Sequence, residues 1–109
     1  MANIYKNAKI DFTNTDNTTI YTVPSNSRAI LKNILVSDDS GSGDSITITL
    51  TDASAAVFSL FKTKTIGSNA TTELITQPVI LQESEILKAQ ATTAARLHMV
   101  VSLLEINRD

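Results

Sequence analysis

Residues 28–37, RAILKNILVS, decide the fold class of this chain of 109 residues. The stretch has apolar side chains on both of its alternating faces, with Ile30, Ile34 and Val36 on one and Ala29, Leu31 and Leu35 on the other. A strand with this pattern is typical of the middle of a sheet in which both faces are covered. We therefore expect residues 28–37 to be a central strand.

The next segment, residues 45–51, reads SITITLT and alternates strictly between apolar residues and threonine or serine. This period of two predicts a strand with one face toward the core and one toward solvent. Threonine is β-branched and fits a half-exposed pleated surface, and the chain holds 15 Thr and 11 Ser. A loop rich in Gly, Ser and Asp, residues 38–44, joins the two predicted strands.

Further strands are expected on both sides of this pair. Alternation or β-branched runs bounded by turn residues predict strands at residues 7–13, 18–23, 56–62, 70–76 and 95–103. Residues 79–81, VIL, are expected to form a buried plug between two turns. Residues 85–96 have the helix propensity of ILKAQATTAAR, but Leu87, Ala89 and Ala91 share one face at a period of two, so we predict a strand and then a tight turn.

These segments together predict an all-β fold, a single antiparallel β-sandwich of jelly-roll type with about eight strands. Residues 7–109 form the sandwich in this interpretation. Residues 1–6 are polar apart from Ile4 and Tyr5, and we expect them to be a flexible N-terminal arm.

The composition excludes several classes of function. The net charge is −2 and the nine Lys and Arg residues are scattered, so we expect no nucleic-acid partner. The chain has no cysteine, which excludes disulfides and thiolate sites. It has no apolar run near the ~18 residues of a membrane helix, and MANIYKNAKIDF lacks the apolar segment of a signal peptide. We expect no membrane partner and synthesis in a cytoplasm.

Three groups of residues are candidates for chemistry. His98 is the single histidine and is expected on the exposed face of the last strand. Glu83 and Glu85 fit a polar turn better than a sugar-cleaving pair, because the chain has no Trp, two Tyr and three Phe to form a sugar platform. The carboxylates of the 38–44 loop, Asp38, Asp39 and Asp44, lack the spacing of an EF-hand. We expect no enzymatic activity, no cofactor and no metal.

Some apolar residues exceed what one core face requires. The run at residues 56–61 is apolar at both parities, and the end of the last strand adds further apolar side chains. Exposed residues of this kind often mark contacts with other subunits. The predicted interface residues are Ile4, Tyr5, Phe58, Phe61, Leu104 and Ile106.

The sequence also resembles a known family. IYTVP at residues 20–24, AILKNILVS at 29–37, PVIL at 78–81, EILKAQA at 85–91 and VSLLEI at 101–106 are similar to a pattern in the small β-sandwich virion proteins of tailed bacteriophages. The pattern has Asn where this chain has Asp38, and often Gly where it has Ser84. The motifs are structural rather than catalytic.

The resemblance implies a capsid decoration (cement) protein on the surface of the virion, made in the host cytoplasm. The implied partners are the major capsid protein or neighbouring virion proteins, together with further copies of the chain, for which a trimer is favoured. A neck or tail component is the first alternative. A carbohydrate-binding jelly-roll module is a weaker one, since aromatic residues are scarce.

Overall fold

The computed structural model describes residues 2–75 and 77–107, and it is an all-β sandwich of two antiparallel sheets. Within these ranges nine strands are present: β1 (Ala2–Asp11), β2 (Thr18–Thr22), β3 (Ser27–Asp38), β4 (Asp44–Thr51), β5 (Val57–Ile66), β6 (Thr71–Glu73), β7 (Val79–Leu81), β8 (Ile86–Ala91) and β9 (Leu97–Asn107). The predicted antiparallel sandwich is confirmed. Among the described residues there is no helix long and apolar enough to cross a membrane.

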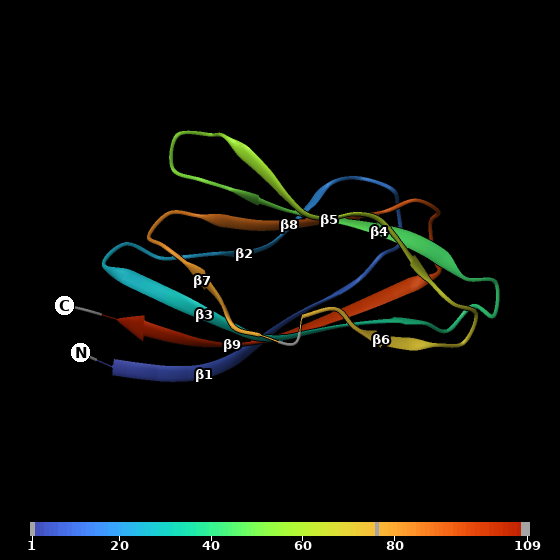
Figure 1. Cartoon of the computed structure of the whole chain (residues 1–109), viewed down its shortest axis with the longest axis horizontal. Helices are drawn as coiled ribbons and strands as arrows, with labels where there is room; N and C mark the ends of the chain where they lie inside the picture. The colour runs from blue at the N-terminus through green and yellow to red at the C-terminus, as the bar shows by residue number, and fades with distance from the viewer. Residues whose placement is uncertain (1, 76, 108–109) are drawn as a thin grey trace.

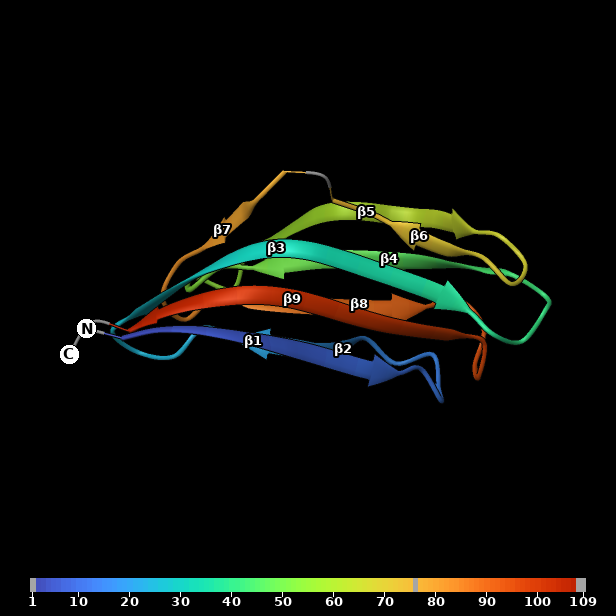
Figure 2. The ribbon, with the colours of Figure 1, turned by 90° about the horizontal axis from the view of Figure 1, so that it is seen from below.

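The nine described strands form two layers, each of which is one sheet (Figure 1). The five-stranded sheet has the order β1-β9-β3-β6, and β7 pairs with β3 beside β6. The four-stranded sheet has the order β2-β8-β4-β5. Figure 2 looks onto the five-stranded sheet, where β1, β9 and β3 run side by side and no other described element lies over them.

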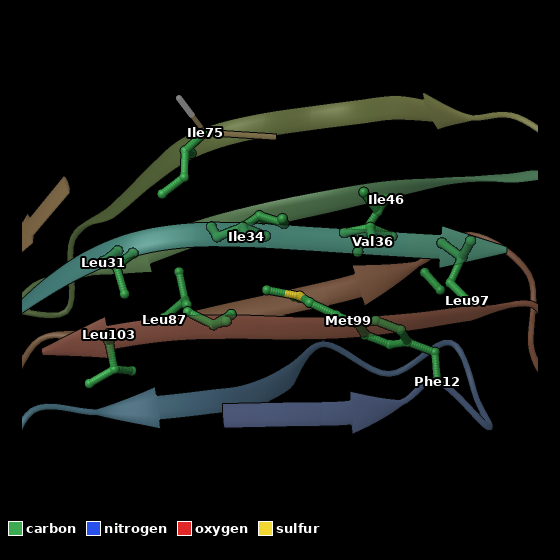
Figure 3. Packing of buried hydrophobic residues seen from close by; sticks show 14 of the residues in the cluster. Phe12, Leu31, Ile34, Val36, Ile46, Ile75, Leu87, Leu97, Met99 and Leu103 are labelled. Carbon is green, nitrogen blue, oxygen red and sulfur yellow. The ribbon is translucent and has the colours of Figure 1, made fainter. Parts of the chain in front are cut away.

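The core lies between the sheets and follows the period of two along each strand. On β3 the inner side chains Ala29, Leu31, Ile34 and Val36 are fully buried. On β9 Leu97, Met99, Val101 and Leu103 are buried, which is the parity that the sequence predicts. Ile46, Ile48 and Leu87 cover them from the four-stranded sheet, as Figure 3 shows in part.

The structure differs from the prediction for β3 in two respects. The predicted faces are regrouped, because a bulge between Leu31 and Asn33 shifts the alternation and places Ile34 and Val36 on the inner side with Ala29 and Leu31. Its second face, with Ile30 and Leu35, is not covered, and Leu35 is 37% exposed. The apolar pattern at both parities was correct, but the conclusion that both faces are buried within the chain was wrong. The outer face of the sheet therefore carries apolar side chains that need another explanation.

Several boundaries also differ. The strand expected at residues 56–62 is β5, which runs to Ile66. Ala2–Lys6 pair with Asn107–Leu103 as the first half of β1, so these residues belong to the sheet and are not a separate arm. β9 begins at Leu97, because Ala95 has a φ of 60° and lies in the turn. The strand expected at residues 70–76 is reduced to β6, with Thr76 outside the described residues, and the expected plug at 79–81 is β7, whose Ile80 is 63% exposed.

We expect Met99→Asp to destabilise the fold by ~3 kcal/mol or more, because it places an unpaired charge between the sheets. Val100→Asp on the outer face of the same strand is the matched control and should cost less than about 1 kcal/mol. Chemical denaturation of both variants measures this difference. Equal losses would show that the faces of β9 are inverted.

Ser84 occupies a turn position that suits glycine, with a φ of 68°, and this is the site where the phage pattern often has Gly. A left-handed conformation strains a side chain with a Cβ, so Ser84→Gly should raise stability by about 0.5–1 kcal/mol. The control Ser102→Gly, in the middle of β9, should lower it by about the same amount. Thermal unfolding compares the two, and a loss at Ser84 would contradict the turn geometry.

Candidate functional site

The outer face of the five-stranded sheet carries a row of apolar residues that crosses four strands. Tyr5 on β1 lies opposite Leu104 on β9, Leu104 opposite Ile30 on β3, and Ile30 opposite Ile80 on β7. Residues directly opposite each other in a sheet point to the same side. Tyr5 is 75% exposed and Ile80 is 63% exposed, so this first row is open to solvent.

A second row lies farther along the same face. It consists of Lys9 on β1, Val100 on β9, Leu35 on β3 and Glu73 on β6, each opposite the next. Val100 and Leu35 are 39% and 37% exposed. The second row thus has an apolar centre with a positive charge at one end and a negative charge at the other.

Polar residues separate and flank the two rows. Between them lie Asn7, Ser102 and Asn33, again in register, and Asn33 Nδ2 donates a hydrogen bond of 2.6 Å to Glu73 Oε2. Beyond the second row, His98 lies opposite Asp11. We call the two rows and the polar residues between them the outer face.

His98 is on the exposed side of β9, as expected. Its Nε2 lies 3.0 Å from Asp11 Oδ1 and its Nδ1 lies 3.5 Å from Asp39 Oδ2. Both carboxylates are more than half exposed. The imidazole and the two carboxylates form a polar surface cluster at the end of the outer face.

The start of β5 forms a second apolar surface. Val57 and Phe58 are 62% and 54% exposed. Phe58 lies opposite Leu50, and Phe61, which is partly buried against the core, lies opposite Ile48. The hairpin that joins β4 to β5 rises away from the rest of its sheet (Figure 1). Its exposed apolar residues are thus on a projection of the sandwich.

The six predicted interface residues belong to more than one surface. Tyr5, Leu104 and Ile106 lie on the outer side of the five-stranded sheet. Ile4 lies opposite the buried Glu105, and Phe58 and Phe61 are on the other sheet. Sequence reasoning missed Ile30, Leu35 and Ile80 as surface residues, although the apolar residues at both parities of β3 were a signal for Ile30 and Leu35.

The 38–44 loop is organised by one carboxylate. Asp38 accepts hydrogen bonds from the Ser40 hydroxyl, and from the backbone N–H groups of Ser40, Gly43 and Asn69, at 2.5 to 3.1 Å. These bonds, that of the Ser40 hydroxyl above all, hold the pKa of Asp38 well below its usual range. Asp44 instead accepts a hydrogen bond from the backbone N–H of Thr93. Within residues 2–75 and 77–107, no group of three metal-ligating side chains occurs.

A shallow hollow of about 470 Å³ lies at the same end of the sandwich. It is lined by Ser42, Gly43, Asp44, Ser45, Thr65, Ile66, Gly67, Ser68 and Arg96. Arg96 Nη1 donates a hydrogen bond of 3.1 Å to the Gly43 carbonyl. The lining has no aromatic ring on which a sugar would stack, so the hollow offers no support for a carbohydrate-binding module.

A buried polar cluster joins the two sheets at the opposite end. Glu105 on β9 is 4% exposed, and its Oε1 accepts hydrogen bonds from the Tyr21 hydroxyl on β2 at 2.5 Å and from Lys6 Nζ at 3.2 Å. The Tyr21 hydrogen bond is the main cause that lowers the pKa of Glu105, and Lys6 adds to it. Burial, together with the same carboxylate, raises the pKa of Tyr21. Sequence reasoning missed this cluster. The available signal was that Glu105, a charged residue, alternates in phase with the buried residues of β9.

The fold is similar to that of two solved assemblies. One is the structure of Bacillus endospore appendages, described as disulfide-linked pili, with a TM-score of 0.58, 13% identity, and coverage of 98% of this chain and 89% of that one. The other is the acid-stable capsid of a Helicobacter pylori bacteriophage, with a TM-score of 0.59, 11% identity, and coverage of 99% and 95%. The sequence matches no protein-family model and no curated protein. At these identities the likeness shows a shared fold.

The Glu105 cluster generates a pH prediction. Because the pKa of Glu105 is below its ordinary value of 4.5 in the folded state, its stabilisation is complete above that value and is lost as the pH falls through the folded pKa. Tyr21→Phe removes the main hydrogen bond and should cost about 1–3 kcal/mol near pH 7. The cost should shrink as the pH falls from 4.5 through the lower folded-state pKa, where Glu105 becomes protonated in the folded protein.

Chemical denaturation at a series of pH values measures this dependence. Tyr5→Phe is the control, since Tyr5 is 75% exposed and should change stability by less than about 0.5 kcal/mol. A cost of Tyr21→Phe that stays constant from neutral to acid pH would contradict the role of the Glu105 carboxylate.

Proposed function

We propose that the chain is a structural subunit of a tailed-bacteriophage virion, and that in the virion it is a capsid decoration protein. The observation that carries this proposal is the fold, which is shared with a phage capsid structure over 99% of this chain and 95% of that one. The resemblance of residues 20–24, 29–37 and 101–106 to small virion proteins supports the same class.

The surfaces of the sandwich support adhesion rather than chemistry. A decoration protein needs exposed side chains that become buried on the shell, and two apolar surfaces of this kind are present. The β4–β5 hairpin is the better fit to a groove, because it projects from the sandwich and presents Val57 and Phe58 (Figure 1). We assign the contact with the major capsid protein to this hairpin.

Binding in this way stabilises the shell by mass action. A ligand that binds the native assembly and not its dissociated subunits shifts the equilibrium toward the assembly. The effect grows with the number of copies bound, so it requires a copy for many of the capsid subunits. The proposal places the chain on the capsid surface, after synthesis in the host cytoplasm.

The pilus likeness suggests a second candidate, a subunit of a filament. Its TM-score of 0.58 is close to the 0.59 of the phage capsid. Those pili are described as disulfide-linked, whereas this chain has no cysteine and has no access to that linkage. This difference favours the capsid over the filament.

The copy number of the chain in purified virions tests the proposal. Quantitative mass spectrometry against the major capsid protein should find hundreds of copies, as expected when a shell is decorated throughout its symmetry. About a dozen copies would assign the chain to a single neck or tail ring and contradict decoration. Absence from virions would contradict the virion assignment itself.

The capsid contact is tested by adding purified chain to undecorated capsids. Phe58→Ser should lower the amount bound by at least about tenfold, since a buried aromatic anchor is worth about 2 kcal/mol or more. Ser59→Ala changes the adjacent exposed residue and should leave binding unchanged. Equal binding of both variants would exclude the hairpin as the contact.

A further inference from the structure

We propose that the outer face of the five-stranded sheet is a self-complementary interface, and that a second copy of this chain covers it. The two copies pack face to face around a twofold axis that runs parallel to the strands, midway between β9 and β3. This inference concerns the free protein and stands whether or not the chain is part of a virion.

The strand order determines which residues of the two copies meet. Across the outer face the order is β1, β9, β3, then β6 and β7 (Figure 2). A twofold axis along the strands between β9 and β3 exchanges β9 with β3 and β1 with β6 and β7. Each row keeps its position along the strand direction. The row of one copy therefore faces the same row of the second copy, with the order of its residues reversed.

In the dimer, the first rows of the two copies pack against each other and form an apolar band. Leu104 of one copy lies over Ile30 of the second copy, and Tyr5 lies over Ile80 of the second copy. Tyr5 and Ile80 are 75% and 63% exposed in the single chain, so this contact removes the most exposed apolar residues of the sheet from water. Sheets that pack face to face lie about 10 Å apart, which apolar side chains of this size fill.

The second row supplies charge complementarity. Its order is Lys9, Val100, Leu35, Glu73, and reversal places Lys9 over Glu73 of the second copy and Val100 over Leu35 of the second copy. Lys9 and Glu73 are three strand spacings apart in one chain, about 14 Å, which is too far for an ion pair. The twofold axis brings both pairs together, one at each side of the interface.

The polar residues between the rows are compatible with this packing. Asn33 lies over Ser102 of the second copy, where an amide and a hydroxyl can form a hydrogen bond. Lys32, in the bulge between Leu31 and Asn33, is exposed and brings a like charge near the axis. This charge opposes association and limits its strength.

The size of the face also indicates modest affinity. Four strands about 4.8 Å apart, over the five residues from Tyr5 to Lys9 that rise about 3.3 Å each, cover on the order of 300 Å². This is below the roughly 800 Å² per partner of a standard stable interface. We expect a dimer with a Kd in the micromolar range. A trimer was expected from the sequence. A row whose two ends carry opposite charges pairs with the same row in reversed order, and this favours a twofold contact.

Sedimentation equilibrium of the purified chain, from about 1 µM to about 200 µM, tests the inference. A monomer–dimer equilibrium is expected. Lys9→Glu and Glu73→Lys should each weaken the dimer by about tenfold or more, because each places like charges opposite one another. The double variant Lys9→Glu with Glu73→Lys restores opposite charges and should recover most of the affinity.

Lys62→Glu, on the exposed β5 of the other sheet, is the matched control and should leave the dimer unchanged. Circular dichroism and thermal unfolding show whether each variant is folded. A monomer at every concentration, a trimer, or a double variant no tighter than the single variants would overturn the proposal. None of these outcomes bears on the copy number in virions, so the two proposals fail separately.

Discussion

The pairing of β3 with β9 is the interaction on which the rest of the structure depends. It runs from Ser27 opposite Asn107 to Asp38 opposite Leu97, and every other strand of the five-stranded sheet attaches to one of these two. Their inner side chains form one wall of the core, and their outer side chains form the centre of the outer face. One pairing register therefore sets both the packing of the sandwich and the rows that it presents to solvent.

The cost of this arrangement is an apolar face that the chain does not cover itself. A single sandwich has one interior, so a sheet with apolar residues at both parities buries only half of them. The buried carboxylate of Glu105, in contrast, accepts hydrogen bonds from both sheets, from Tyr21 on β2 and from Lys6 on β1. Ile30 and Leu35 remain at the surface, on the face that we propose a second copy covers.

Much of the sandwich could be predicted from the sequence, because alternation reports directly on which face a side chain occupies. The inner residues of β9 and the strand at residues 86–91 were found in this way, against a local helix propensity. Alternation does not show whether another element covers the outer face of a sheet, so the exposure of Leu35 was missed. Ala2–Lys6 contain few apolar residues, so alternation also does not show that they pair with the edge of β9 as part of a strand.

The candidate surfaces were predicted in part. Tyr5 and Leu104 were selected because they exceed the needs of one core, and they are neighbours across β1 and β9. Their relation to Ile30 and Ile80 depends on strand order and register, which involve residues far apart in the sequence. The position of Glu105 in the alternation of β9 indicated that its side chain is buried. Its partner Tyr21 comes from the other sheet, and no local sequence pattern pairs the two residues.

Paramagnetic relaxation from a soluble gadolinium chelate measures most directly whether the outer face is covered by a second copy. With methyl-labelled protein, the methyl groups of Leu35, Ile80, Val100 and Leu104 should become protected from the chelate as the protein concentration rises through the Kd. The methyl groups of Val57, on the other sheet, should remain accessible throughout. Outer-face methyl groups that stay as accessible as those of Val57 at every concentration would show that the face is not covered by self-association.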